Sequence, residues 1–418
     1  SGLFRALHRT KVFRNLTEQE FAWVLYDVEI GILLLLACSL IPIWFKSLAI
    51  GTGGKNQFGS GDGVLFIAIS IVTVVVALIG PVCGVLADRK DKKKIFFTTT
   101  AGLGITGCVL NGVATSWVLF LVIYIVTRVC YNASLTIYDS MLNDVTTEER
   151  MDEVSSYGYA WGYLGSCIPF LVALIAYVLG PDMVGVLPDF VSKMIGFSVT
   201  ALWWLVVTLP LLKEYRQKNY VEMRTVTVGQ TFGKIFGTLK KIAVSDRKVF
   251  FFLIGFFLYI DGVGTIIDNC INIGTDLNLN TVGQVVSACH AGCRFWRISV
   301  FCKTVAEKRY GIPDSDLHCR LFCHLPLCAD TADAGALCDS GIWSGMLSGI
   351  NSVVVAVVLF QNYSGGEFGE YFGIYDIFAK GASFLGSVVI AVVKLAGGTI
   401  NVAVACLAFF FALGFVFL

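Results

Sequence analysis

The sequence predicts an all-α, polytopic membrane protein built from two helical halves. Apolar residues make up 56% of its 418 residues, charged residues only 15%, and the mean hydropathy is +0.75. Soluble domains carry about 25% charged residues, so this composition favours a chain that lies mostly in a lipid bilayer. The formal net charge of +1 lacks the basic excess of a nucleic-acid-binding protein, so we expect no nucleic-acid partner.

Apolar runs of membrane-spanning length recur along the chain. A membrane helix needs about 20 residues and a connecting loop about a dozen more, which leaves room for about twelve spans. Ten of them can be located directly, at residues 21–45, 63–87, 95–113, 117–142, 157–179, 194–212, 249–273, 342–360, 374–395 and 400–418. The expected eighth and ninth spans would fall between residues 277 and 340, where the apolar pattern is broken.

A long polar stretch divides the chain into two halves. The predicted parts are a cytoplasmic basic arm, an N-terminal six-helix half, a cytoplasmic linker and a C-terminal half, at residues 1–20, 21–212, 213–248 and 249–418. The arm ends in the capping-box pattern Thr17–Glu20, which starts a helix. Within the linker, apolar residues recur at helical spacing beside lysines, at Phe232, Ile235, Phe236 and Leu239. This pattern predicts a basic amphipathic helix on the inner membrane surface, with a plain solvated linker as the alternative.

Lysine and arginine gather in the loops of one predicted side of the membrane. The basic arm, the loop that follows the second span and the linker all carry several of them, whereas the opposite loops carry few. The positive-inside rule therefore predicts an integral, multi-pass protein with a cytoplasmic N-terminus. In a bacterium, it would lie in the plasma membrane.

A charged motif lies at the inner end of the second span. Its residues Gly84, Asp88, Arg89 and Lys93 fit the Gly-x-x-x-Asp-Arg-x-x-x-Lys pattern of the major facilitator superfamily. The glycine allows helices to approach closely, and the charges at a helix end can form a latch that holds one conformational state. The motif therefore resembles that of a six-plus-six helix bundle. The alternative is a basic inner loop that matches by chance.

Charged residues near the bilayer midplane mark a candidate substrate and ion pathway, because such residues are costly there. Arg128 in the fourth span and Asp261 in the seventh lie at matching depth, and further polar residues follow on the same helix faces, at Asn132, Asp139, Thr265 and Asp268. This arrangement predicts a central site between two repeats, with Asp261 as a candidate carrier of a coupling proton. A structural ion pair that holds the halves together is the alternative. Asp27 lies nearer the inner end of the first span.

Several segments resemble the autophagy-linked vacuolar amino-acid effluxer family, the "unknown major facilitator" branch of the superfamily. The resemblance rests on residues 257–267, 131–133 and 158–165, and on a signature at residues 370–386 that includes Tyr371, Gly373, Tyr375, Asp376, Lys380 and Gly381. It implies a twelve-helix fold and export of small solutes, of which amino acids are the best-known case.

The first span departs from the pattern of that family. Family members continue it as Tyr-Asp-Trp-Ala-Asn-Ser, whereas Tyr26-Asp27 is followed here by Val28-Glu29. The resemblance therefore gives only weak support for a role of Asp27, and it implies none for Glu29.

Residues 289–338 are unusually rich in cysteine and histidine. They hold Cys289, Cys293, Cys302, Cys319, Cys323, Cys328 and Cys338 of the 14 cysteines, and His290, His318 and His324 of the 4 histidines. A metal module is one interpretation, although the spacings fit no standard zinc site. The preferred hypothesis is a shifted reading frame around residues 285–365, because permitted codons for residues 311–324, read one base later, give an apolar run. In that case the eighth and ninth spans are malformed and the cysteines carry no chemistry.

The leading functional hypothesis is a secondary active transporter or effluxer of small solutes, amino acids among them, that works by alternating access. It predicts no enzyme activity, no cofactor and no metal. The expected partners are the lipid bilayer, a small-molecule solute and protons, and we expect a monomer. The alternatives are a membrane protein with a Cys/His metal-binding segment, or a non-functional product of a frame-disrupted transporter gene.

Overall fold

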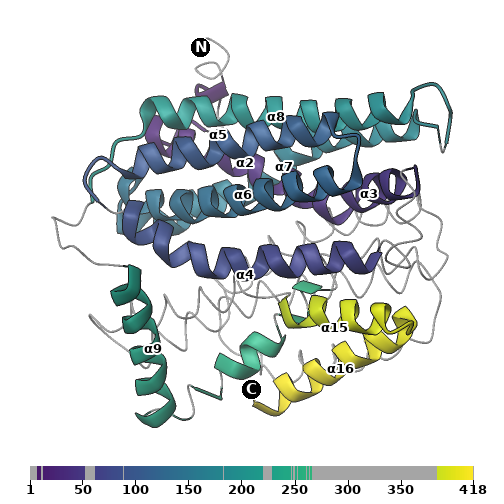
Figure 1. Cartoon of the computed structure of the whole chain (residues 1–418). Helices are drawn as coiled ribbons and strands as arrows, with labels where there is room; N and C mark the ends of the chain where they lie inside the picture. Colours follow the sequence, from purple (N-terminus) through teal and green to yellow (C-terminus); the bar gives the residue numbers. More distant parts are fainter. Residues whose placement is uncertain are drawn as a thin grey trace, which may run out of the picture. The chain divides into compact units, whose positions relative to one another are not determined.

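The computed structural model of the chain describes residues 7–10, 13–51, 62–87, 89–181, 183–219, 228–245, most of 247–265, and 384–417. These residues are overwhelmingly helical, which agrees with the predicted all-α class (Figure 1). The chain divides into two compact units, of which the first holds Ser1–Thr52 and Leu78–Val226 and the second holds Gly53–Ala77 and Thr227–Leu418.

The helices of the first unit lie where the first six spans are predicted. α2 and α3 together cover the first span and meet at Ser39, which lies outside both helices. The other helices follow in order, with α4 shared between the units: α2 (Glu18–Cys38), α3 (Leu40–Gly51), α4 (Asp62–Ala87), α5 (Lys93–Val113), α6 (Trp117–Val145), η2 (Glu148–Arg150), α7 (Met151–Val178) and α8 (Asp189–Glu214).

The predicted capping box starts α2. The Thr17 hydroxyl accepts a hydrogen bond from the backbone N–H of Glu20 at 3.2 Å, and the Glu20 carboxylate accepts one from the backbone N–H of Thr17 at 2.8 Å. The two bonds satisfy backbone donors that would otherwise lack a partner at a helix end. The sequence pattern thus fixes the first residue of the first membrane helix.

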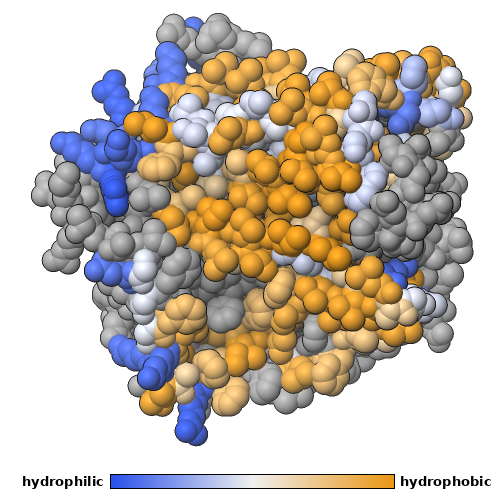
Figure 2. Space-filling model, in the orientation of Figure 1, coloured by the Kyte–Doolittle hydropathy of each residue, from blue (hydrophilic) through white to orange (hydrophobic). Residues whose placement is uncertain are grey.

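Three helices among the described residues, α5, α6 and α8, have the length and apolar composition needed to cross a membrane. Their outward faces carry exposed large apolar side chains such as Leu103, Val122 and Leu202. Figure 2 shows apolar side chains spread across the middle of the first unit's face, with hydrophilic ones gathered toward its two ends. A surface of this kind suits lipid rather than water.

Glycines on α7 allow α2 to pack very closely against it. A Cβ atom added at Gly158 would lie 2.2 Å from the Asp27 Oδ2 atom, and one added at Gly165 would lie 2.2 Å from the Val28 Cγ1 atom. Gly162 lies between them and faces the backbone of Asp27. Small residues at such spacing allow membrane helices to approach each other backbone to backbone. The segment that resembles the effluxer family therefore forms a helix–helix seam.

The second unit is described in part. Its helices are α9 (Val228–Ser245), α15 (Phe384–Leu395) and α16 (Ile400–Phe417), and residues 253–259 are also helical. α9 lies in the predicted linker and has an amphipathic sequence, with Phe236, Lys240 and Lys241 exposed and Ile242 buried.

Part of the predicted organisation lies outside the described residues. This applies to the eighth and ninth spans, to the Cys/His-rich segment 289–338 and the suspected frame shift at 285–365, and to the signature residues Tyr371, Gly373, Tyr375, Asp376, Lys380 and Gly381.

Candidate functional site

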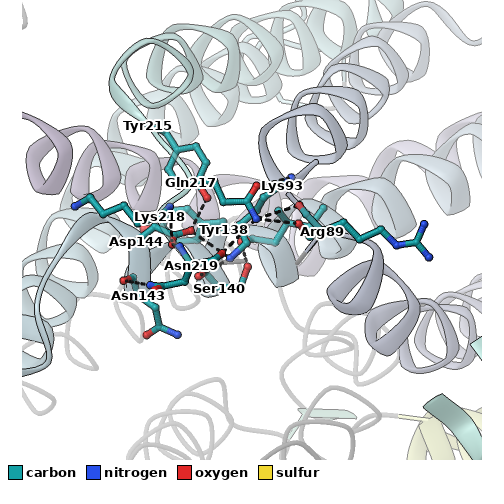
Figure 3. A network of polar contacts seen from close by, with 12 residues as sticks. Arg89, Lys93, Tyr138, Ser140, Asn143, Asp144, Tyr215, Gln217, Lys218 and Asn219 are labelled. Carbon is teal, nitrogen blue, oxygen red and sulfur yellow. Dashed lines mark hydrogen bonds and ion pairs between the residues drawn. The ribbon is translucent and has the colours of Figure 1, made fainter. Parts of the chain in front are cut away.

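A buried carboxylate, Asp144, is the centre of a polar network at the end of α6 (Figure 3). Its Oδ2 atom accepts hydrogen bonds from Lys93 Nζ at 3.2 Å and from the Tyr215 hydroxyl at 2.6 Å. Its Oδ1 atom accepts from the backbone N–H groups of Asn219 at 2.7 Å and Lys218 at 3.2 Å. Four donors therefore satisfy this buried carboxylate, with Lys93 as its ion-pair partner.

Gln217 connects the same network to the loop between α4 and α5. Its side-chain amide donates to the backbone carbonyl of Arg89 at 3.1 Å, and its carbonyl accepts from the backbone N–H of Lys93 at 3.4 Å. The first residues of the linker are thus bound both to α6 and to the loop that carries the predicted latch (Figure 3).

The predicted latch residues differ in burial and in the contacts that they make. Lys93 is buried and pairs with Asp144, which sequence reasoning did not select. Arg89 is exposed and takes part through its backbone carbonyl. Gly84 lies in α4, and Asp88 lies outside the described residues. An acidic residue in the last turn of an apolar helix was the signal that could have found Asp144.

Arg128 and Asn132 occupy successive turns of one face of α6. The Arg128 guanidinium lies over the Tyr131 ring at 5.8 Å from its centroid, and the Asn132 amide donates to the Arg128 backbone carbonyl at 2.8 Å. Arg128 is half-buried, whereas Asp139 further along the helix is exposed. Arg128 thus presents a cation about eleven residues, or roughly 16 Å, into the helix. Charged side chains at such a depth in a membrane helix are rare and costly, which keeps Arg128 a candidate for the pathway.

Asp261 is buried in the second unit, where it binds the N-terminal end of α15. Its two carboxylate oxygens accept backbone N–H groups of Leu385 at 2.9 Å and Gly386 at 2.7 Å. Thr265 is buried on the next turn and faces Gly386, where an added Cβ would lie 2.2 Å from its hydroxyl oxygen. These contacts give Asp261 the geometry of a helix cap. Arg128 and Asp261 belong to different units, so their predicted pairing stays a prediction. Asp268 lies outside the described residues.

Two acidic residues of α2 lie inside the first unit. Asp27 is buried in the α2–α7 seam, against Gly158. Glu29 is 0% exposed, and among the described residues neither of its carboxylate oxygens has a hydrogen-bond partner. Sequence reasoning assigned no role to Glu29. Its position in an apolar helix two residues after Asp27 was the available signal.

The described residues contain no group of three or more His, Cys, Asp or Glu side chains that could hold a metal ion. The Cys/His-rich segment lies outside them, so its ligand chemistry is untested.

The chain is similar to known membrane transporters along its whole length. It is 29% identical over 425 residues to an uncharacterised major-facilitator-type transporter, YxiO, of Bacillus subtilis (strain 168), and the match covers 97% of this chain and 95% of that protein. The model of the family "Vacuole effluxer Atg22 like" matches residues 143–289.

Solved structures of transporters have the same fold. A D-xylose-proton symporter matches with a TM-score of 0.71 at 11% identity, covering 94% of this chain and 95% of that one. A peptide transporter, POT, in complex with sulfate matches with a TM-score of 0.69 at 11% identity, covering 95% and 93%. The nucleoside transporter NupG matches with a TM-score of 0.64 at 14% identity, covering 96% and 98%.

These similarities favour a transporter over a metal-binding membrane protein and over a non-functional product. The named relatives are transporters, in line with the expectation that the chain is not an enzyme. The chain is an integral, multi-pass membrane protein with the helical fold of major-facilitator-type transporters, and it resembles the Atg22-like vacuole effluxer family.

Proposed function

We propose that this chain is a secondary active transporter that exports small solutes by alternating access, with amino acids as the first substrate class to test. The observation that carries the proposal is the full-length similarity to a major-facilitator-type transporter. The match to the Atg22-like effluxer model supports export as the direction.

Arg128 is the residue that we propose to bind the solute. A guanidinium group held over an aromatic ring presents several donors in a fixed plane, which suits a carboxylate such as that of an amino acid. The half-buried position of Arg128 in α6 strengthens such a contact because nearby water is scarce. Asn132, one turn further along, would be a second polar contact for the solute.

A transport assay on purified protein in lipid vesicles tests this proposal. Vesicles loaded with a mixture of unlabelled amino acids should accumulate a labelled member of the mixture by exchange. Arg128→Lys keeps the charge but loses the planar donor group, so we expect at least a tenfold loss of exchange. Arg216→Lys is the matched control because Arg216 is exposed beyond the end of α8. Full exchange by Arg128→Lys would show that the solute binds elsewhere.

Proton coupling is part of the same proposal. A structural neighbour is a D-xylose-proton symporter, and intramembrane carboxylates are the usual carriers of a coupled proton. Solute flux measured with and without an imposed pH gradient tests the coupling. A uniporter would show the same flux in both conditions.

We further propose that the N-terminus is cytoplasmic, that the membrane is the plasma membrane if the source is a bacterium, and that the chain acts as a monomer. The support for this orientation is the basic arm, the basic loop after the second span and the basic linker. A single cysteine introduced at Arg14, in a variant without other cysteines, should react with a membrane-impermeant thiol reagent only after the cells are opened. Reaction in intact cells would show that the N-terminus lies outside the cell.

A further inference from the structure

Glu29 lies in the middle of the membrane-spanning part of α2. It follows residue 21, where the predicted first span begins, by eight residues, which is roughly 12 Å at 1.5 Å per residue. The hydrocarbon core of a bilayer is about 30 Å thick, so Glu29 lies close to its midplane. Its side chain is 0% exposed, and neither carboxylate oxygen accepts a hydrogen bond from the described residues.

Glu29 forms no hydrogen bond with a cationic side chain among the described residues, so no such bond balances an ionised carboxylate. Its electrostatic neighbours are Tyr26 and Asp27 on α2, Cys108 on α5 and Tyr131 on α6. Each of these is neutral or acidic. Arg128 lies over the ring of Tyr131, but no ion pair joins it to Glu29.

Among the other helices packed against α2, α7 and α8 carry their charges near their ends, and α3 carries Lys46 beyond the end of α2. α3, α7 and α8 are the helices concerned, and their charged residues are Lys46, Asp152, Glu153, Asp189, Lys193, Lys213 and Glu214. The remaining titratable side chains of α7 are tyrosines and Cys167, which do not supply a cation. In the part of the chain that the structure describes, the helices packed on α2 therefore place no cation at the depth of Glu29 apart from Arg128 on α6.

A buried carboxyl group in these surroundings is far more stable with a proton than without one. An ionised carboxylate without partners loses its hydration and gains nothing in return, whereas the neutral acid has a much smaller cost of burial. Because the side chain has no exposed surface, a proton is the one ligand that it can hold without rearrangement of the helices around it.

We propose that Glu29 is a proton-binding residue of the transport cycle. It is protonated in the conformation described here. When α2 shifts along α7 and water reaches the carboxyl group, the O–H bond breaks, the proton passes to water and the carboxylate remains. Proton uptake from water on the other side of the membrane reverses the step. This inference rests on the proposed transport function.

The α2–α7 seam is suited to such a shift. Gly158, Gly162 and Gly165 present a smooth surface to Asp27 and Val28, so that one helix can move along the other without side chains that interlock. The contacts also favour Glu29 over Asp261 as the proton carrier. Both oxygens of Asp261 accept backbone N–H groups, which stabilise its ionised form.

Infrared spectroscopy tests the protonation directly and needs no solute. The spectrum of the wild-type protein in vesicles at neutral pH, minus that of Glu29→Gln, should contain the carbonyl stretch of one protonated carboxylic acid. Glu18→Gln is the control, because Glu18 is exposed at the start of the same helix and should lose only carboxylate bands. Carboxylate bands in the Glu29→Gln difference spectrum would overturn the proposal.

A second variant covers the case in which Glu29→Gln does not fold. Glu29→Asp retains a carboxylic acid in a slightly different position, so its carbonyl band should shift in frequency and persist. A spectrum of Glu29→Asp that is identical to that of the wild type in this region would also overturn the proposal.

Transport measurements separate this inference from the proposed function. For a solute identified in the exchange assay, Glu29→Gln should retain exchange to within twofold and lose at least tenfold of the uptake driven by a pH gradient. Equal loss of both activities would contradict a role in proton coupling. If the wild-type protein exchanges no solute, the transport proposal fails, and the infrared result still decides whether Glu29 holds a proton.

Discussion

Trp23 on α2 and Tyr138 on α6 each donate a hydrogen bond to the backbone carbonyl of the other. The Trp23 indole N–H donates to the Tyr138 carbonyl at 3.2 Å, and the Tyr138 hydroxyl donates to the Trp23 carbonyl at 3.0 Å. Their rings stack with centroids 4.6 Å apart and 9° between the planes. This reciprocal pair fixes the height at which the two helices cross, and hence the depth at which Glu29 on α2 faces Tyr131 on α6.

The reciprocal pair should be cooperative. We expect Tyr138→Phe to lower the free energy of unfolding by about 1–2 kcal/mol, because a buried hydrogen bond is lost while the ring stacking is kept. Trp23→Phe should have a similar effect. The double variant should cost less than the sum of the two, since each single change also disturbs the other contact. Thermal unfolding of the protein in detergent measures these values, and strict additivity would show that the two bonds act independently.

Replacing one partner of the buried ion pair between Lys93 and Asp144 should cost more stability than either change in the Trp23–Tyr138 pair. Asp144→Asn leaves the Lys93 ammonium buried without its partner, and breaking a buried pair in this way costs about 3–5 kcal/mol. We expect a large fall in the unfolding temperature. Lys93→Met in addition should restore much of the loss, because it removes the uncompensated charge. A double variant no more stable than Asp144→Asn would show that the bonds to Tyr215 and Asn219 carry the stability instead.

The sequence was sufficient to predict the helical class, the membrane location and the position of the first helix. Apolar length and composition determine these features locally, and the Thr17–Glu20 pattern marks its own helix start. The resemblance to the effluxer family likewise rested on short motifs, and the similarity to transporters along the whole chain supports it.

The partners of the charged residues could not be predicted in the same way. Lys93 and Asp144 are 51 residues apart in sequence, and Asp261 and Leu385 are 124 apart, so only helix packing brings them together. A charge in an apolar run signals importance without revealing whether it binds a solute, pairs with another charge or caps a helix. Glu29 was overlooked because the family pattern gave it no role, whereas its lack of partners is visible only in three dimensions.

The glycine seam between α2 and α7 should tolerate no side chain. Gly158→Ala would place a methyl group 2.2 Å from the Asp27 carboxylate and 2.9 Å from the Trp23 ring, so we expect a loss of about 1–3 kcal/mol of stability. Gly102→Ala is the matched control. Gly102 lies in α5 with no atom within 4 Å of the added methyl group, so this change should be neutral or stabilising by up to about 1 kcal/mol. Equal thermal stability of the two variants would contradict the close packing.

Asp261 should hold the beginning of α15 through its negative charge and its two acceptor oxygens. Asp261→Leu would leave the buried N–H groups of Leu385 and Gly386 without acceptors, at about 1–3 kcal/mol for each group. Asp261→Asn keeps one acceptor oxygen and should have roughly half the effect. Hydrogen exchange measured by mass spectrometry on peptides from α15 should show faster exchange at its first turn in the order Leu, Asn, wild type. Unchanged hydrogen exchange in Asp261→Leu would show that other groups hold this helix end. It would then favour the substrate and ion pathway role that the depth of Asp261 in the membrane predicts.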